Sequence, residues 1–183
     1  VYGTGEKQTA KVSRRIAERI EGRGHDVTVT NVEEVPADLS ASEFDAVLVG
    51  SSVHVGKHHR DIPAFLNANQ RTLADRPTAF FQLSLSSAMD DADRRAEAAS
   101  YVDSLLEDTD WQPDRIGLFG GALRYSKYGC LKRLVMKRIA RNATGDVDTT
   151  RDYEYTDWAE VDAFADDVAA FVEGRLGVDP NAD

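Results

Sequence analysis

The sequence predicts a single α/β domain built on a parallel sheet. Three observations support this fold class. The 183 residues, 42% hydrophobic and 30% charged, suit one globular domain with an ordinary core. Short apolar runs alternate along the chain with stretches of helical periodicity, as in βαβ units. Polar loops directly follow three of the apolar runs. We therefore treat residues 1–183 as one domain.

A strand, a loop and a helix come first. Val1 and Tyr2 form the apolar end of a buried strand, and residues 3–9 form a turn rich in glycine and hydroxyl groups. A helix through Glu21 follows, because apolar residues recur at the i, i+3, i+4 spacing of one helix face. These residues are Val12, Ile16, Ala17 and Ile20.

The remaining elements follow in alternation. Strands are predicted at residues 27–32, 44–49, 78–83 and 115–119, and helices at residues 61–73, at 90–106 and from about 156 onward. Residues 44–49 and 78–83 are nearly continuous apolar runs, which is typical of strands buried on both faces. Asp157 and Glu160 have the spacing of a capping box at the start of the last helix.

Three polar loops, residues 3–9, 50–56 and 84–88, end three parallel strands and should meet at one edge of the sheet. The first loop suits a phosphate, because helix N-terminal N–H groups and the Thr4 and Thr9 hydroxyls can donate to it. The Gly-x-Gly-x-x-Gly fingerprint of dinucleotide binding is absent, because Gln8 stands where its third glycine should be. The loops therefore indicate a mononucleotide that carries a planar group. An ordinary βα turn with a threonine cap is the alternative.

The net charge and the cysteine content limit which partners the protein is expected to bind and in which cellular compartment it is expected. The formal net charge of −10 argues against duplex nucleic acid, whose binding depends on neutralising phosphates. Cys130 is the only cysteine, so no intramolecular disulfide can form and a reducing compartment is expected. No apolar run approaches the ~20 residues that a membrane span needs. We expect a cytoplasmic protein, at most peripheral at the cytoplasmic face of a membrane.

Residues 115–143 contrast with the acidic chain, because they hold no acidic residue and eight basic ones. Within them, an apolar stripe with adjacent basic side chains predicts a cationic amphipathic helix. The stripe consists of Leu131, Leu134, Val135 and Ile139. Either this helix covers its own core with arginines in solvent, or it presents a surface to an anionic substrate or anionic lipid.

The order of elements and the loop at residues 3–9 resemble flavodoxin, whose corresponding loop binds the phosphate of FMN. Later segments are more specific. Residues 121–125 (GALRY), Tyr128 and residues 155–158 (YTDW) resemble the flavodoxin-like menaquinone-dependent protoporphyrinogen IX dehydrogenases of haem biosynthesis. The resemblance covers essentially the whole chain.

This resemblance implies a flavodoxin-like, doubly wound, five-stranded parallel sheet of order 2-1-3-4-5, with a basic insertion at about residues 124–155. It implies FMN, with its phosphate at Thr4, Gly5, Glu6, Lys7, Gln8 and Thr9. The flavin ring would lie beside Ser52, Val53, His54 and Val55 and beside Ser84, Leu85, Ser86 and Ser87. Because the first strand of such a sheet is central and needs about five apolar residues, we expect the natural chain to carry residues before Val1.

The implied reaction is oxidation of protoporphyrinogen IX to protoporphyrin IX, with menaquinone or another membrane quinone as electron acceptor. Arg124, helped by Lys127 and Lys132, would bind the propionates. No side chain is assigned as a catalytic acid or base, and none as a metal ligand. His54 and its neighbours His58 and His59 suit flavin contact or solvent better than a metal.

Two departures from flavodoxin bear on function. Lys7 stands where glycine is usual, and no large aromatic residue is available to cover the flavin ring. An open ring face suits an enzyme that binds its substrate there. A flavodoxin-type electron-transfer protein, whose basic patch docks a protein partner, stays open as an alternative. So does an NAD(P)H-quinone reductase, although no nicotinamide fingerprint is present.

Overall fold

The computed structural model describes residues 1–128 and 130–178. Its sheet contains four parallel strands in the order β1 (Tyr2–Gly3), β2 (Val47–His54), β4 (Thr78–Ser84) and β5 (Arg115–Gly120). A short fifth strand, β3 (Lys57–His58), pairs antiparallel with β2. The α/β class and the order of these parallel strands are as predicted.

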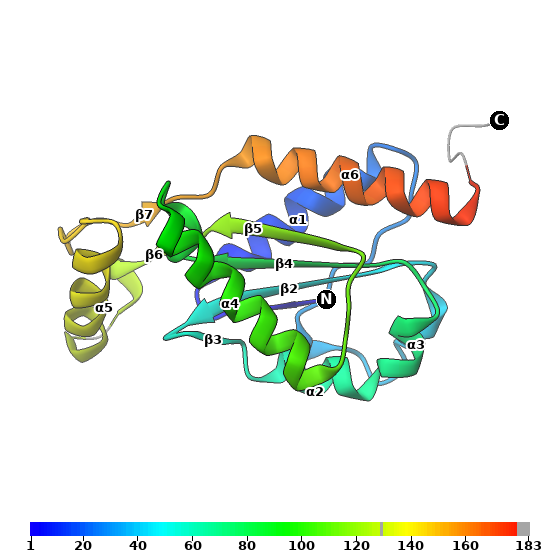
Figure 1. The fold of residues 1–183 in the computed structure, drawn as a ribbon, viewed down its shortest axis with the longest axis horizontal. Helices are drawn as coiled ribbons and strands as arrows, with labels where there is room; N and C mark the ends of the chain where they lie inside the picture. The colour runs from blue at the N-terminus through cyan, green and yellow to red at the C-terminus, as the bar shows by residue number, and fades with distance from the viewer. Residues whose placement is uncertain (129, 179–183) are drawn as a thin grey trace.

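Helices cover both faces of the sheet (Figure 1). Helices α1 (Gln8–Glu21) and α6 (Trp158–Leu176) lie on one face. The other face carries α2 (Asp61–Ala68), α3 (Gln70–Ala74) and α4 (Ala92–Thr109). Short 3-10 turns occur at η1 (Val32–Glu34), η2 (Ala41–Glu43), η3 (Ser86–Ala88) and η4 (Tyr125–Lys127). This is a doubly wound α/β domain.

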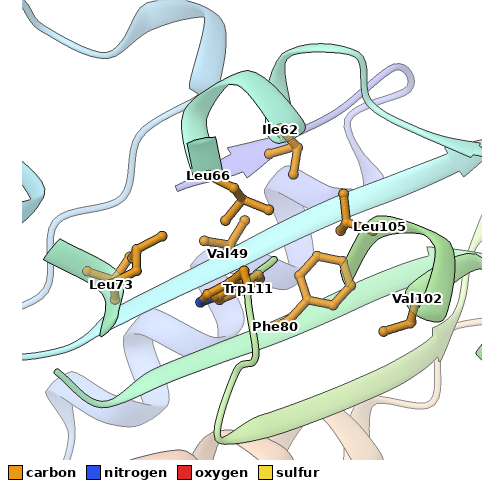
Figure 2. Packing of buried hydrophobic residues seen from close by; sticks show 9 residues of the cluster. Val49, Ile62, Leu66, Leu73, Phe80, Val102, Leu105 and Trp111 are labelled. Carbon is orange, nitrogen blue, oxygen red and sulfur yellow. The ribbon is translucent and has the colours of Figure 1, made fainter. Parts of the chain in front are cut away.

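The core has two parts, one on each side of the sheet. Figure 2 shows Val49 and Phe80, from β2 and β4, pointing toward Leu66 and Leu105 of α2 and α4. Phe81, the next residue of β4, packs on the opposite face with residues of α1 and α6. Successive residues of a strand point to opposite faces, so a strand covered on both sides must be apolar throughout. This explains the continuous apolar runs.

The strand predicted at residues 27–32 was wrong, because this segment forms no strand. Residues 25–30 lie outside any strand, and the segment meets β1 through one parallel bridge between Tyr2 and Asn31. The Tyr2 N–H also donates to the Thr30 carbonyl at 3.0 Å. Because β1 comprises two residues, it offers this segment little backbone with which to build a ladder. The segment nevertheless lies where the predicted order places it.

Two further boundaries differ from prediction. The second polar loop was expected at residues 50–56, but β2 continues to His54 and then turns back as β3. The helix predicted at 61–73 is divided into α2 and α3 at Asn69. The Asn69 side chain donates to the Phe65 carbonyl at 2.8 Å, and such local bonds compete with helix geometry.

Residues 122–154, which contain most of the predicted insertion and are called the insertion from here on, form a small subdomain. It contains β6 (Ala122–Leu123), α5 (Cys130–Ala143) and β7 (Tyr153–Glu154), with β6 and β7 paired antiparallel. It lies beyond the carboxyl ends of β2, β4 and β5 (Figure 1). None of the helices in the described part of the chain combines the length and apolar character needed to span a bilayer.

Candidate functional site

A cavity of about 440 Å³ opens at the carboxyl ends of the parallel strands, within the size range of small-ligand sites. The three predicted loop segments meet around it. Eleven of the fourteen residues predicted to contact a cofactor line it: Thr4, Glu6, Gln8, Thr9, Ser52, Val53, His54, Val55, Ser84, Leu85 and Ser86. Gly5, Lys7 and Ser87 belong to the same segments but do not line the cavity.

The first loop has the features of an anion site. Helix α1 begins at Gln8, so the N–H groups of its first turn lack intrahelical partners and face this end of the cavity. The Thr4 and Thr9 hydroxyls are buried, and neither has a hydrogen-bond partner among the described residues. Buried hydroxyls are rarely left unpaired in folded proteins. A phosphate of a bound nucleotide would satisfy both hydroxyls.

Lys7 caps α1 in the left-handed conformation, with φ 67°. The departure from glycine at this position therefore has a cost, because a left-handed residue with a side chain is strained by roughly 1–2 kcal/mol. The Lys7 side chain is exposed. The loop thus depends on the backbone turn at residue 7.

Gln8 is held from two sides. Its Nε2 donates to Thr156 Oγ1 at 2.9 Å, and its Oε1 accepts from Arg124 Nη2 at 2.8 Å. Arg124 Nη2 also donates to Glu154 Oε2 at 3.0 Å. The guanidinium predicted to bind a propionate therefore contacts the first loop and β7. The side chains of Lys127 and Lys132, the two predicted helpers, lie outside the described part of the structure.

Glu6 makes a second contact with the insertion. Its Oε2 accepts a hydrogen bond of 2.6 Å from the Tyr128 hydroxyl, and both residues are buried. Burial and this bond to Glu6 raise the pKa of Tyr128, so its hydroxyl stays protonated at neutral pH.

The tip of the β2–β3 hairpin forms the second wall. Val55 and Gly56, its two central residues, have φ values of 51° and 73°, as in a type I′ turn. A β-branched residue is an outlier in this conformation. Val55 also exposes 82% of its surface while lining the cavity. The hairpin therefore holds an apolar side chain at the mouth of the site, at a cost in backbone strain.

His54 lies against the first loop. A Cβ atom on Gly5 would fall 2.7 Å from His54 Nε2, so any other residue at this position would require the His54 ring to move. His58 points elsewhere, with Nε2 3.0 Å from Gln82 Oε1, and burial lowers its pKa. His59 and Asp61 lie beside Glu33, with one potential ligand atom from each within 4.8 Å of the others, and none of the three lines the cavity.

Sequence reasoning missed a polar cluster on α4. Arg94, Glu97 and Tyr101 line the cavity beside the third loop. Ser86 Oγ donates to Glu97 Oε2 at 2.7 Å, and Arg94 Nη1 donates to the same oxygen at 3.0 Å. The bond from Ser86 is the main cause that lowers the pKa of Glu97, whereas burial is the main cause that raises the pKa of Tyr101. The i, i+3, i+7 spacing of the three residues could have marked one helix face.

The insertion supplies the last wall, through Ala122 and Met136. Helix α5 packs on the tyrosines of its own subdomain through Met136 and Ala140. Of the two readings left open for the predicted apolar stripe, a core-facing surface does not describe Leu134 and Val135, which are 67% and 47% exposed. Core contact falls on positions 136 and 140, one turn apart. The side chains of Leu131 and Ile139 lie outside the described part.

Comparisons with known proteins agree with this architecture. The flavodoxin domain family matches residues 1–150. The chain is 28% identical, over 92% of each chain, to a protein of Escherichia coli strain K12 named protoporphyrinogen IX dehydrogenase [quinone]. A Leishmania major protein of the same name is 31% identical over 70% of this chain, which spans 55% of that protein.

Among solved structures, a flavodoxin from the domain Archaea superposes with a TM-score of 0.51 at 17% identity, covering 94% of this chain and 95% of that one. This likeness concerns the fold. The expected flavodoxin-like fold and the resemblance to protoporphyrinogen IX dehydrogenases are both confirmed.

Proposed function

Because the chain belongs to the flavodoxin domain family, we propose that it is an FMN-dependent oxidoreductase that converts protoporphyrinogen IX to protoporphyrin IX with a quinone as electron acceptor. One observation carries the proposal. The cavity joins flavodoxin-type loops to walls contributed by the insertion, in a chain that the Escherichia coli relative of that name matches over 92% of its length. A cofactor and a second ligand could therefore meet in one site.

The residues present fit FMN. Thr4 and Thr9 offer two buried hydroxyls, and the start of α1 offers backbone N–H groups, so this end would hold the phosphate. Residues 52–55 and 84–87 would flank the ring. When bound, FMN supplies the two-electron redox chemistry. The chain itself would hold the ring in place and leave one face open beside Val55.

The substrate loses six electrons and six protons, so three quinone molecules become three quinols. We assign no catalytic acid or base to the chain. Arg124 stays the proposed propionate ligand, with Lys127 and Lys132 beside it, because a guanidinium matches a carboxylate in a bidentate pair. To bind the substrate, Arg124 would exchange its contact with Glu154 for a propionate.

A membrane quinone would be met at the membrane surface, and α5 suits such a surface. Leu134 and Val135 are exposed on it, close to the exposed basic residues Lys137, Arg138 and Arg141. Each basic residue near an anionic surface contributes ~1 kcal/mol. We therefore propose peripheral attachment at the cytoplasmic face of the membrane.

The attachment can be measured by co-sedimentation with vesicles that contain anionic lipid. Replacing Lys137, Arg138 and Arg141 with Gln should reduce binding strongly, and added salt should do the same to the wild type. Vesicles of neutral lipid are the control. Equal sedimentation of the variant and the wild type would contradict the proposal.

The enzymatic proposal is tested with FMN-loaded protein, protoporphyrinogen IX and a menaquinone analogue under anaerobic conditions. Porphyrin fluorescence should rise well above the spontaneous rate and depend on the quinone. A flavodoxin-type electron carrier is the second candidate, favoured by the exposed basic surface of α5, which suits an acidic protein partner equally well. Porphyrin formation at the spontaneous rate would favour that carrier, and reduction of the flavin by NAD(P)H would favour a quinone reductase.

A further inference from the structure

The insertion is tied to the first loop and the start of α1 by hydrogen bonds that span more than 100 residues of sequence. Tyr128 donates to Glu6 at 2.6 Å, and Arg124 donates to Gln8 at 2.8 Å. A third contact joins Lys11 of α1 to Glu154 of β7 at 2.8 Å. The insertion therefore contacts the loop independently of any substrate.

The bond between Tyr128 and Glu6 is the best shielded of these contacts. Tyr128 is 4% exposed and Glu6 is 7% exposed. The Tyr128 hydroxyl also accepts a hydrogen bond of 3.2 Å from the backbone N–H of Arg124, and this bond fixes the orientation of the hydroxyl. Hydrogen bonds to charged groups are the stronger ones, and removing a donor from a buried carboxylate is costly.

Glu6 and Gln8, the two loop residues that the insertion contacts, lie on either side of the strained residue Lys7. Lys7, between Glu6 and Gln8, has the left-handed backbone that starts α1. A strained conformation persists only where its surroundings hold it. Here the surroundings include Tyr128, bonded to Glu6, and Arg124, bonded to Gln8, both from the insertion.

We propose that Tyr128 and Arg124 are positioning residues for the phosphate site, so that FMN binding and ordering of the insertion are thermodynamically linked. The insertion stabilises the turn that directs the N–H groups of α1 at the phosphate. By reciprocity, bound phosphate stabilises the insertion by the same factor. This inference rests on the proposed FMN site. It gives the insertion a role in cofactor binding beyond any contact with substrate.

The first test is FMN titration of the apoprotein, followed by flavin fluorescence. Tyr128→Phe should weaken FMN binding about tenfold, because one hydrogen bond to a buried carboxylate is lost. Tyr125→Phe is the matched control. The Tyr125 hydroxyl donates to the Asp146 carbonyl at 3.1 Å within the insertion and does not contact the loop. Its removal should leave FMN affinity within about twofold.

A double-mutant cycle adds a readout that general destabilisation would not move. Glu6→Gln and Tyr128→Phe should be non-additive in FMN affinity, because each removes the same pair. Hydrogen exchange of the wild type supplies a test without substitutions. Amides of α5 and of β6–β7 should exchange more slowly with FMN bound, and Tyr128→Phe should reduce this protection.

The outcomes separate the two proposals. Wild-type protein that binds FMN with unchanged exchange in the insertion, or a Tyr128→Phe variant with wild-type affinity, would overturn the linkage and leave the FMN site standing. Wild-type protein that fails to bind FMN would overturn both. If Tyr128→Phe does not fold, exchange in the wild type with and without FMN decides alone.

Discussion

The first loop and the hairpin tip both turn on a non-glycine residue in the left-handed conformation, but they use it differently. Lys7, φ 67°, does not line the cavity and projects an exposed side chain. Val55, φ 51°, lines the cavity, and its apolar side chain is 82% exposed. At residue 7 the turn itself directs the N–H groups of α1, whereas at residue 55 the turn presents a side chain.

This difference shows how to interpret strain at a binding site. Left-handed residues with a side chain cost of order 1–3 kcal/mol, and such strain gathers at functional sites. Where only the backbone matters, glycine should relieve the strain without loss of function. Where the side chain matters, relief of strain should cost ligand binding. The two turns can therefore be separated by substitution.

The largest effect should come from the phosphate end that the Lys7 turn serves. Thr9→Val should weaken FMN binding by roughly 10- to 100-fold, because a hydrogen bond to a charged group contributes ~1.5–3 kcal/mol. The same change should raise the stability of the apoprotein, because it replaces a buried hydroxyl without a partner among the described residues by a methyl group. FMN titration and urea unfolding of the apoprotein measure the two effects.

Thr9→Ser is the control for this substitution, because it keeps the hydroxyl. Its FMN affinity should stay within a few-fold of wild type. A Thr9→Val variant that binds FMN normally would show that the hydroxyl does not contact the phosphate.

The next effect concerns the hairpin. Val55→Asn should raise the free energy of unfolding by ~1 kcal/mol, because asparagine tolerates the left-handed region and Asn-Gly is preferred in type I′ turns. For a chain of this size the melting temperature should then rise by ~2–4 °C. The KM for the porphyrinogen should rise several-fold, since an apolar contact at the cavity mouth is lost. A more stable variant with unchanged KM and FMN affinity would show that the Val55 side chain does not contribute to ligand binding.

A smaller effect is expected at residue 7. Lys7→Gly should stabilise the protein by ~0.5–1 kcal/mol, because glycine adopts the left-handed conformation without steric cost. FMN affinity should stay equal or increase slightly, since the Lys7 side chain does not line the cavity. Thermal unfolding and FMN titration of the variant measure both quantities. Weaker FMN binding would mean that the lysine charge contributes to phosphate binding, and the contrast with Val55 would fail.

Sequence patterns predicted the parts of this site that depend on local chemistry. Buried strands were visible as apolar runs, and a loop that ends a parallel strand must lie at the carboxyl edge of the sheet. Convergence of Thr4, Ser52 and Ser84 therefore followed from topology. The continuation of β2 to His54 was missed, because a polar strand end and a polar loop have the same composition.

Contacts between distant elements could not be predicted in this way. The bond from Tyr128 to Glu6 joins residues 122 positions apart, and nothing in either local sequence specifies the partner. Tyr101 and Glu97 of α4 looked like members of an ordinary acidic helix. Their place in the cavity depends on how α4 is rotated against the third loop, which is decided by tertiary packing.

The smallest effect on stability is expected at the third loop. Unlike the turns at residues 7 and 55, this loop depends on side-chain hydrogen bonds for its shape. Residue 85 has a negative φ of −72°, Ser84 Oγ accepts from the Ser87 N–H at 3.0 Å, and Ser86 is bonded to Glu97. The contribution of this loop to the stability of the protein should therefore depend on pH. The pKa of Glu97 is lowered in the folded state, mainly by the bond from Ser86. Its contribution to stability is therefore present above the ordinary glutamate pKa and is lost as pH falls through the lowered value.

The prediction is tested by comparing the wild type with Glu97→Gln, which keeps the shape and an acceptor but does not titrate. The wild type should be slightly more stable at pH 7, and this advantage should vanish as the pH falls through the lowered pKa of Glu97. Because the Glu97 side chain is 37% exposed, solvent screening should keep the difference below ~1 kcal/mol. Urea unfolding at a series of pH values measures it. A difference that persists undiminished in acid would show that the loop does not depend on the Glu97 charge.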